Sequence, residues 1–205
     1  MDENFEYFLE KMGPCITKRM APPSSIERYR GKLPSQLLAY WDEHGWAGYA
    51  DGLFWTVNPQ EYEAVVEAWI GNTAFMAEDV FHIIARGAFG KLYLWGERTG
   101  YALKIFAPGS FCIPAIEPSP IDDMDFETQI FFGGITRKGN DFVDMFAPAF
   151  ERLGVLKHDE MYGFVPALAL GGACEPEYLQ KVKAVEHLVL LAQLAPLEVI
   201  TSPPF

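Results

Sequence analysis

The stretch VFHIIARGAFGKLYLWGERTGYALKIFA, residues 80–107, carries the clearest strand pattern in the chain. Three runs within it, 80–86, 91–97 and 101–107, are rich in the aromatic and β-branched residues that favour strands. Residues 97–100 (ERTG) have the composition of a turn that connects the last two runs. These features predict an antiparallel meander of three strands.

Two helices and a further strand are predicted before this meander. Residues 59–70 follow Asn58, with proline and glutamate at the first and third helical positions, which is typical of a helix start. Another helix, 35–44, ends at Gly45, and residues 51–57 (DGLFWTV) predict a turn and a strand. The apolar positions expected to face a core are Leu37, Leu38 and Trp41 in 35–44, and Tyr62, Val65, Val66, Trp69 and Ile70 in 59–70.

The second half of the chain is predicted to be mostly helical. Residues 108–125 contain four prolines and predict an irregular segment or a domain junction. Apolar residues at helical spacing then predict helices over 141–153 and 177–194. The expected fold class is α+β, with an antiparallel sheet and flanking helices in an N-terminal lobe and a largely helical C-terminal lobe packed against it.

The composition excludes several classes of partner. The chain carries 28 acidic and 16 basic residues, a formal net charge of -12, so nucleic acids and anionic membranes would repel it. Its longest apolar stretch, 187–200, is too short to span a bilayer, and its acidic start, MDENFEYFLEKMG, does not resemble a signal peptide. Cys15, Cys112 and Cys174 are odd in number and lack C-x-x-C spacing, which favours reduced thiols. We expect a cytoplasmic protein that binds a basic partner and takes no cofactor.

Two long windows of the sequence lack basic residues. One lies between Lys32 and Arg86, and the other covers 105–136. Acids over such lengths cannot all be neutralised by sequence neighbours, although folding can bring distant lysines alongside them. We therefore expect a surface with a negative field that speeds encounter with a cationic partner. The acids are Asp42, Glu43, Asp51, Glu61, Glu63, Glu67, Glu78 and Asp79 in the first window, and Glu117, Asp122, Asp123, Asp125 and Glu127 in the second.

The segment LKHDEMYGFVPALALGG, residues 156–172, places His158, Asp159 and Glu160 in a row beside an apolar run. Three adjacent side chains do not converge on one point in a helix or a strand, as metal ligands and catalytic groups must. We interpret the segment as a structural turn with a polar tip at 157–160, and predict no catalytic residue and no metal site. The side chains expected to pack inward are Tyr162, Phe164, Val165, Leu168 and Leu170.

Two longer segments resemble known families. LPSQLLAYWDEHGWAGYADGLFWTVNPQEYEAVVEAWI (33–70), continued by AFGKLYLWGE (88–97), resembles the GAD-like domain of bacterial proteins. FAPAFERLGVLKHDEMYGFVPALALGG (146–172), followed by VKAVEHLVLLAQL (182–194), resembles the C-terminal domain of the Tdi family of type VI secretion immunity proteins. The resemblance implies a GAD-like domain over 1–110 and a Tdi-type domain over 121–205. It also implies a non-enzymatic protein that binds and blocks a cognate DNase toxin in the cytoplasm.

The charge pattern suggests how such a protein would act. A DNase presents basic groups to phosphates, so an acidic protein that covers those groups competes with DNA. Alternatively, the protein distorts the toxin or blocks its active conformation. The acids predicted to bind the toxin follow the prolines or lie in the polar tip, with Phe126 anchoring the first group to the core. They are Asp122, Asp123, Asp125 and Glu127, together with Asp159 and Glu160.

Two other functional classes stay open from the residues. One is a small-ligand or nucleotide-sensing module, with a pocket between the two halves walled by Trp46, Trp55 or Trp95. The other is a hydrolase that uses the carboxylates of 121–127 and 158–160. A neighbouring gene for a basic, nuclease-like toxin would favour the immunity hypothesis over both.

Overall fold

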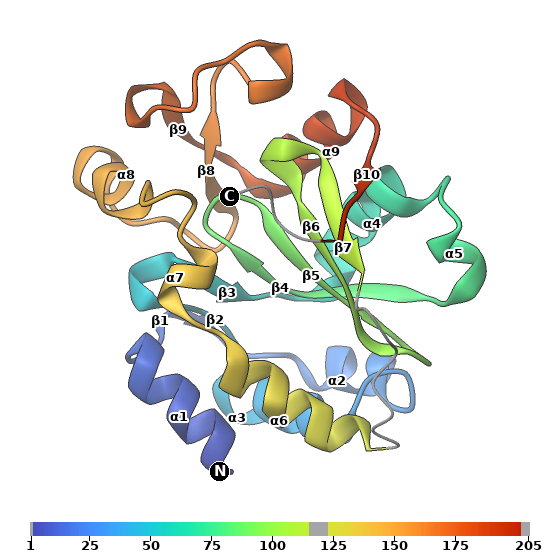
Figure 1. Ribbon diagram of the computed structural model, residues 1–205. Coiled ribbons are helices and arrows are strands. Elements are labelled where there is room, and N and C mark those ends of the chain that lie inside the picture. Colours follow the sequence, from blue (N-terminus) through green and yellow to red (C-terminus); the bar gives the residue numbers. More distant parts are fainter. Residues whose placement is uncertain (1, 115–122, 202–205) are drawn as a thin grey trace.

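The computed structural model describes residues 2–114 and 123–201, and a mixed sheet runs through its middle (Figure 1). The sheet has eight strands in the order β1-β2-β3-β4-β5-β6-β7-β10 within the described residues. Neighbouring strands are antiparallel except for β7 and β10, which are parallel. The strands are β1 Ile16–Arg19, β2 Trp46–Tyr49, β3 Phe54–Thr56, β4 Phe81–Gly87, β5 Lys91–Gly96, β6 Gly100–Phe106, β7 Phe111–Pro114 and β10 Glu198–Val199.

The predicted meander is confirmed as β4, β5 and β6, the centre of the sheet. Its register pairs Tyr93 with Lys104 and Trp95 with Tyr101. Every residue of β5 after Lys91 is buried, because helices cover both faces of the sheet. The β5–β6 turn closes at Gly100, whose φ of +70° is one that L side chains rarely adopt.

Helices form one layer below the sheet and another above it in the view of Figure 1. The chain crosses between these layers more than once, because α6 of the C-terminal half lies below the sheet against α1 and α3. Gly133 of α6 permits this approach, since a Cβ there would lie 2.9 Å from Asn4 Oδ1 of α1. The lower layer holds α1 Glu3–Met12, α2 Pro23–Tyr29, α3 Ser35–His44 and α6 Met124–Gly134; the upper holds α4 Glu63–Ile70, α8 Phe146–Leu153, α9 Ala184–Leu194 and the hairpin of β8 Glu160–Phe164 and β9 Leu179–Lys183.

The predicted helices before the meander are confirmed. Helix α3 spans Ser35–His44 and is capped by Gly45, as the sequence indicates. The predicted helix 59–70 begins with a 3-10 turn, Pro59–Tyr62, and continues as α4. Asn58 caps this start, with its side chain accepting a hydrogen bond from the backbone of Gln60 at 3.2 Å.

Three predictions for the second half were wrong at their boundaries. Residues 108–125 are not wholly irregular, because β7 lies among them and pairs with β6; residues 115–122 lie outside the described part. The helix predicted over 141–153 starts only at Phe146, since Val143 and Asp144 have positive φ. The helix predicted over 177–194 starts at Ala184, because Leu179–Lys183 forms β9.

The α+β fold class is confirmed, and both halves contribute to one hydrophobic core. Trp69 of α4 donates its indole N–H to the carbonyl of Leu188 in α9, at 3.1 Å. Strand β10 completes the sheet edge beside β7. The division into domains at 1–110 and 121–205 stays a prediction. None of the helices in the described part of the chain has the length and apolar character that crossing a bilayer requires.

Arg86 is a fully buried cation at the junction of the two halves. Its Nε donates to the hydroxyl of Tyr62 at 2.9 Å, and its Nη2 donates to the carbonyls of His158 and Glu160 at 2.9 and 2.8 Å. Its guanidinium also lies over the ring of Trp55, 5.2 Å from the ring centroid. The polar tip at 157–160 is therefore held to the sheet by its backbone, with the side chains of Lys157 and His158 exposed.

Candidate partner-binding surface and central cavity

The acids predicted after the prolines have different roles in the structure. Asp123 is exposed and caps α6, with its carboxylate accepting from the backbone N–H groups of Asp125 and Phe126. Asp125 accepts from the backbone of Gln36 at 2.8 Å, which joins α6 to α3. Glu127 is buried and accepts from the backbone of Tyr101 at 3.1 Å. Asp122 lies outside the described residues.

Burial corrects two expectations about this segment. Burial raises the pKa of Glu127, and the hydrogen bond from Tyr101 opposes that rise only in part. Glu127 is thus a structural carboxyl group and not an exposed one. Phe126 does not anchor the segment to the core, because 45% of it is exposed.

Asp159 and Glu160 lie in the polar tip, as predicted, but are engaged locally. Asp159 forms an ion pair with Lys183, and the hydrogen bond from Lys183 lowers the pKa of Asp159. The carboxylate of Glu160 accepts from the backbone of Lys157 at 2.9 Å. The tip lies above the sheet and α6 below it, so the structure does not bring the two predicted groups of acids together (Figure 1).

The apolar run after the tip packs inward only in part. Tyr162 and Phe164 are buried, as predicted. Val165 and Leu170 are 40% and 64% exposed, so the prediction that they pack inward was wrong. Both lie in the connection between β8 and β9, where the hairpin extends beyond the core.

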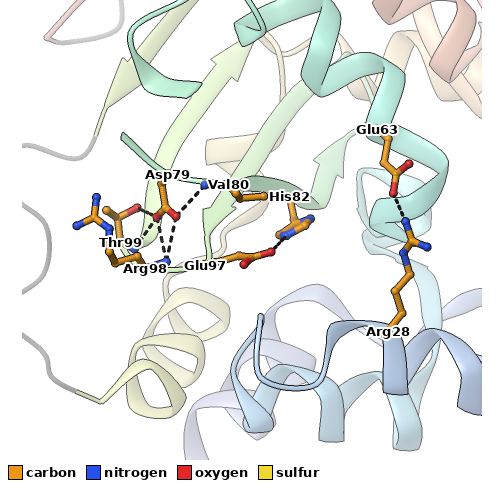
Figure 2. Close-up of polar contacts among 8 residues, drawn as sticks. All are labelled: Arg28, Glu63, Asp79, Val80, His82, Glu97, Arg98 and Thr99. Atoms are coloured by element: carbon orange, nitrogen blue, oxygen red, sulfur yellow. Dashed lines mark hydrogen bonds and ion pairs between the residues drawn. The ribbon is translucent and has the colours of Figure 1, made fainter. Parts of the chain in front are cut away.

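Three arginines from outside the stretch between Lys32 and Arg86 form ion pairs with acids inside it. Arg19 pairs with Glu61 at 2.8 Å and Arg28 with Glu63 at 2.7 Å, the latter shown in Figure 2. Arg137 pairs with Asp51 at 3.3 Å. The negative field expected from this window is therefore weaker than the sequence indicates.

Asp79, in the same window, organises the β5–β6 turn (Figure 2). Its carboxylate accepts from the backbone N–H groups of Val80, Arg98 and Thr99 and from the Thr99 hydroxyl. Burial would raise the pKa of Asp79, but these hydrogen bonds outweigh it and lower the pKa. His82 and Glu97 form a neighbouring pair at 2.8 Å. These groups hold the turn.

Replacing Asp79 by Asn is expected to lower the free energy of unfolding by about 1 kcal/mol at neutral pH, because the amide nitrogen cannot accept hydrogen bonds. Since the pKa of Asp79 is lowered in the folded state, its stabilisation is present above the unfolded value and is lost as pH falls through the folded value. Urea unfolding at several pH values measures the effect. Glu78→Gln is the control; an equal loss in both variants, or a D79N effect that grows in acid, would contradict the assignment.

Helix α1 carries acids that the sequence reasoning missed as a binding surface. Glu3, Glu6 and Glu10 are exposed, and Tyr7 beside them is 54% exposed. No ion pair to these acids occurs within residues 2–114 and 123–201. Their helical spacing in MDENFEYFLEKMG was the available signal.

Helix α1, which carries these acids, packs against α6. The ammonium of Lys11 in α1 donates to the carbonyl of Gly133 in α6, which fixes the two helices side by side (Figure 1). Phe126 and Ile130 on α6 are each 45% exposed. We define the α1–α6 surface as Glu3, Glu6, Tyr7, Glu10, Asp123, Phe126 and Ile130. It combines negative charge with exposed apolar side chains.

A cavity of about 370 Å³ lies on the other side of α6, between the sheet and the segment from α6 to α7 Arg137–Asn140. Lys91 of β5 and Lys104 of β6 both line it. The ammonium of Lys91 donates to the carbonyl of Gly139 at 2.7 Å, and the hydroxyl of Tyr93 donates to Asn140 Oδ1 at 2.8 Å. The small-ligand hypothesis places Trp46, Trp55 or Trp95 in the wall of a pocket, but none of them lines this cavity, because the core encloses all three.

Within the part of the chain that the structure describes, no group of three or more His, Cys, Asp or Glu side chains is arranged to hold a metal ion. All three cysteines are free thiols, and Cys112 is buried in β7. Burial raises the pKa of Cys112 to about 11, which keeps this thiol protonated at neutral pH.

Two family models match the chain in the order that the fold shows. Residues 3–109 match the GAD-like domain, and residues 126–195 match the C-terminal region of the type VI secretion system immunity protein Tdi1. These matches define the class, an immunity protein of type VI secretion. The chain belongs to the GAD-like domain family, with a C-terminal region of the Tdi1 type.

The fold has a solved counterpart. The crystal structure of Atu4351 from Agrobacterium tumefaciens aligns with a TM-score of 0.85 and 23% sequence identity, over 97% of this chain and 94% of that chain. At this identity the likeness establishes the fold. No curated protein matches the sequence.

Proposed function

We propose that this immunity protein binds a cognate DNase effector of type VI secretion in the cytoplasm and covers the toxin's basic DNA-binding surface with its α1–α6 surface. The observation that carries the proposal is the set of exposed acids on α1, a helix that packs against α6, which itself exposes Phe126 and Ile130. Apolar anchors supply affinity, and unpaired charges steer a partner of opposite charge. A DNase has such a partner surface, because it must hold phosphates.

The six acids predicted from the sequence enter this proposal unequally. Asp123 belongs to the α1–α6 surface, and Asp122 stays a predicted contact. Asp125 and Glu127 support the surface by fixing α6 to α3 and to β6. Asp159 and Glu160 lie across the sheet from it (Figure 1), so a toxin that covers the α1–α6 surface does not reach them by the same contact.

The proposed inhibition is stoichiometric and needs no chemistry from the immunity protein. The expected result is complete loss of plasmid cleavage by the purified cognate toxin at one equivalent of this protein, with an unrelated basic DNase unaffected. The toxin would be taken from the gene beside the one for this chain. Inhibition at a small fraction of one equivalent would indicate enzymatic inactivation, and unimpeded cleavage at an excess would overturn the proposal.

Competition with DNA distinguishes coverage from distortion of the toxin. If the α1–α6 surface covers the DNA-binding groups, a catalytically inactive toxin loses DNA binding as the immunity protein is added. If the toxin bound DNA and this protein together, its DNA-binding surface would be uncovered, and the proposed mode of inhibition would be wrong while the immunity role stood.

A further inference from the structure

The cavity behind α6 has a floor and a wall from distant parts of the chain. Lys91 and Tyr93 on β5 and Lys104 on β6 form the floor, while residues of α6 and α7 form the wall. Tyr93 is held in place by Asn140, whose side-chain amide donates to the carbonyl of Thr136 at 3.0 Å. The polar groups are thus positioned before any ligand binds.

The floor carries two lysines that form no ion pair within the described residues. Because Lys104 pairs with Tyr93 across the strands, Lys104 and Lys91 occupy diagonal positions on one face of the sheet, with Cα atoms about 7–8 Å apart. Within the described residues the ammonium of Lys104 has no hydrogen-bond or ion-pair partner, and that of Lys91 contacts only the carbonyl of Gly139 among hydrogen-bond acceptors. The ammonium of Lys91 also lies over the rings of Tyr93 and Phe106, 5.2 and 5.0 Å from their centroids, so Lys104 is the lysine of the floor whose ammonium has no partner within the described residues.

The remaining wall has an apolar part, and it also contains the buried carboxyl group of Glu127, which accepts a hydrogen bond from the backbone of Tyr101. Tyr101 and Ile130 line the cavity, and both are partly exposed. A volume of about 370 Å³ is at the lower end of the range for small-molecule sites. Such a site suits a molecule with one anionic group and a compact apolar or planar body.

We propose that this cavity binds a small organic anion, with its phosphate or carboxylate at Lys104 and Lys91 and its body against Tyr101 and Ile130. Each ammonium still has donors to give, since an ammonium has three and Lys91 uses one on Gly139. The site lies outside the α1–α6 surface except at Ile130, so it is separable from toxin binding.

Four probes separate the contribution of the anionic group to binding from that of the apolar or planar part of the ligand. AMP carries a phosphate on a planar body, benzoate carries a carboxylate, inorganic phosphate is the anion alone, and adenosine is a body without charge. Titration of the protein followed by amide NMR is expected to show AMP or benzoate binding more tightly than phosphate and adenosine. The shifts should centre on Lys91, Lys104, Tyr101 and Thr136. Adenosine binding as tightly as AMP, or no shift from any probe at millimolar concentration, would overturn the proposal.

Lys104→Ala is the decisive variant, because Lys104 has no structural partner within the described residues and its loss leaves the fold intact. It is expected to weaken binding of the best probe by about tenfold, the usual effect of losing one charge-assisted hydrogen bond. Lys138→Ala, an exposed lysine of α7 that does not line the cavity, is the matched control. Equal affinities for the two variants would place the anion elsewhere and refute the site.

The pH dependence provides a second readout. Burial, with the charge of Lys104 adding to it, lowers the pKa of Lys91 to about 8, and burial also lowers the pKa of Lys104. The other titratable groups lining the cavity are Tyr93, Tyr101 and Glu127. Binding is expected to weaken as pH rises through about 8, since Lys91 loses its charge there. Affinity that is flat or rises over that range would contradict a role for Lys91.

Discussion

Replacing Arg86 by Ala is expected to lower the free energy of unfolding by roughly 3–5 kcal/mol, a large share of the stability of an ordinary domain. The variant removes a fully buried side chain and leaves the hydroxyl of Tyr62 and the carbonyls of His158 and Glu160 without their donor. Buried polar groups without partners cost about 1–3 kcal/mol each before any cavity is counted.

Urea unfolding followed by tryptophan fluorescence measures this effect. Arg86→Lys keeps the positive charge but loses the planar fork that reaches two carbonyls at once, so it is expected to fall between the wild type and Arg86→Ala. Arg137→Ala is the control, because its pair with Asp51 is exposed and contributes within about 1 kcal/mol. A loss for Arg86→Ala no larger than that of the control would show that the tip at 157–160 is held by other contacts.

Reversing the charge of Glu3, Glu6 and Glu10 to Lys is expected to weaken binding of the proposed DNase toxin by about a hundredfold, mainly through slower association. These side chains are exposed on α1, and no ion pair holds them within the described residues, so the substitutions leave the packing of Phe5 and Phe8 unchanged. Stopped-flow association at low and high salt measures the rate, and the difference from wild type is expected to shrink as salt screens the charges.

The matched control reverses Glu67 of α4 together with Glu175 and Glu177 of the connection between β8 and β9, which are also exposed. These elements belong to the layer above the sheet (Figure 1). Both triple variants change the net charge equally, so they separate the position of the charge from its total. Equal slowing in both would mean that only the overall field of the protein steers the toxin. No slowing in the α1 variant would remove the α1–α6 surface from the interface.

Strong local patterns made much of the fold predictable. The meander follows from runs of aromatic and β-branched residues, and α3 and α4 follow from their caps and apolar spacing. Strand β9 was missed because Leu179, Val182 and Val185 also have helical spacing, and only pairing with β8 makes 179–183 a strand. Such pairing depends on contacts between distant residues, which local periodicity does not contain.

The candidate site was less predictable than the fold. The sequence places Glu127 beside three aspartates, but only the fold shows that it is buried against Tyr101. Ion pairs such as Arg28 with Glu63 join residues far apart in the chain. Acids in a stretch of sequence without basic residues are therefore not necessarily unpaired in the fold. The cavity was hidden for the same reason, since β5, β6, α6 and α7 each contribute only part of its lining.

The outward side of α1 has a consequence for how relatives of this chain diverge. Phe5, Phe8 and Met12 fix the helix to the core, while Glu3, Glu6 and Glu10 contact nothing that the fold requires. Substitutions at the outward positions cost little, about 0.3–1 kcal/mol each at Glu3 and Glu6 in the first turn of the helix, whereas those at the inward positions cost several times more. Recognition can then change one residue at a time while the scaffold persists, so new toxin and immunity pairs can arise by drift on a constant architecture.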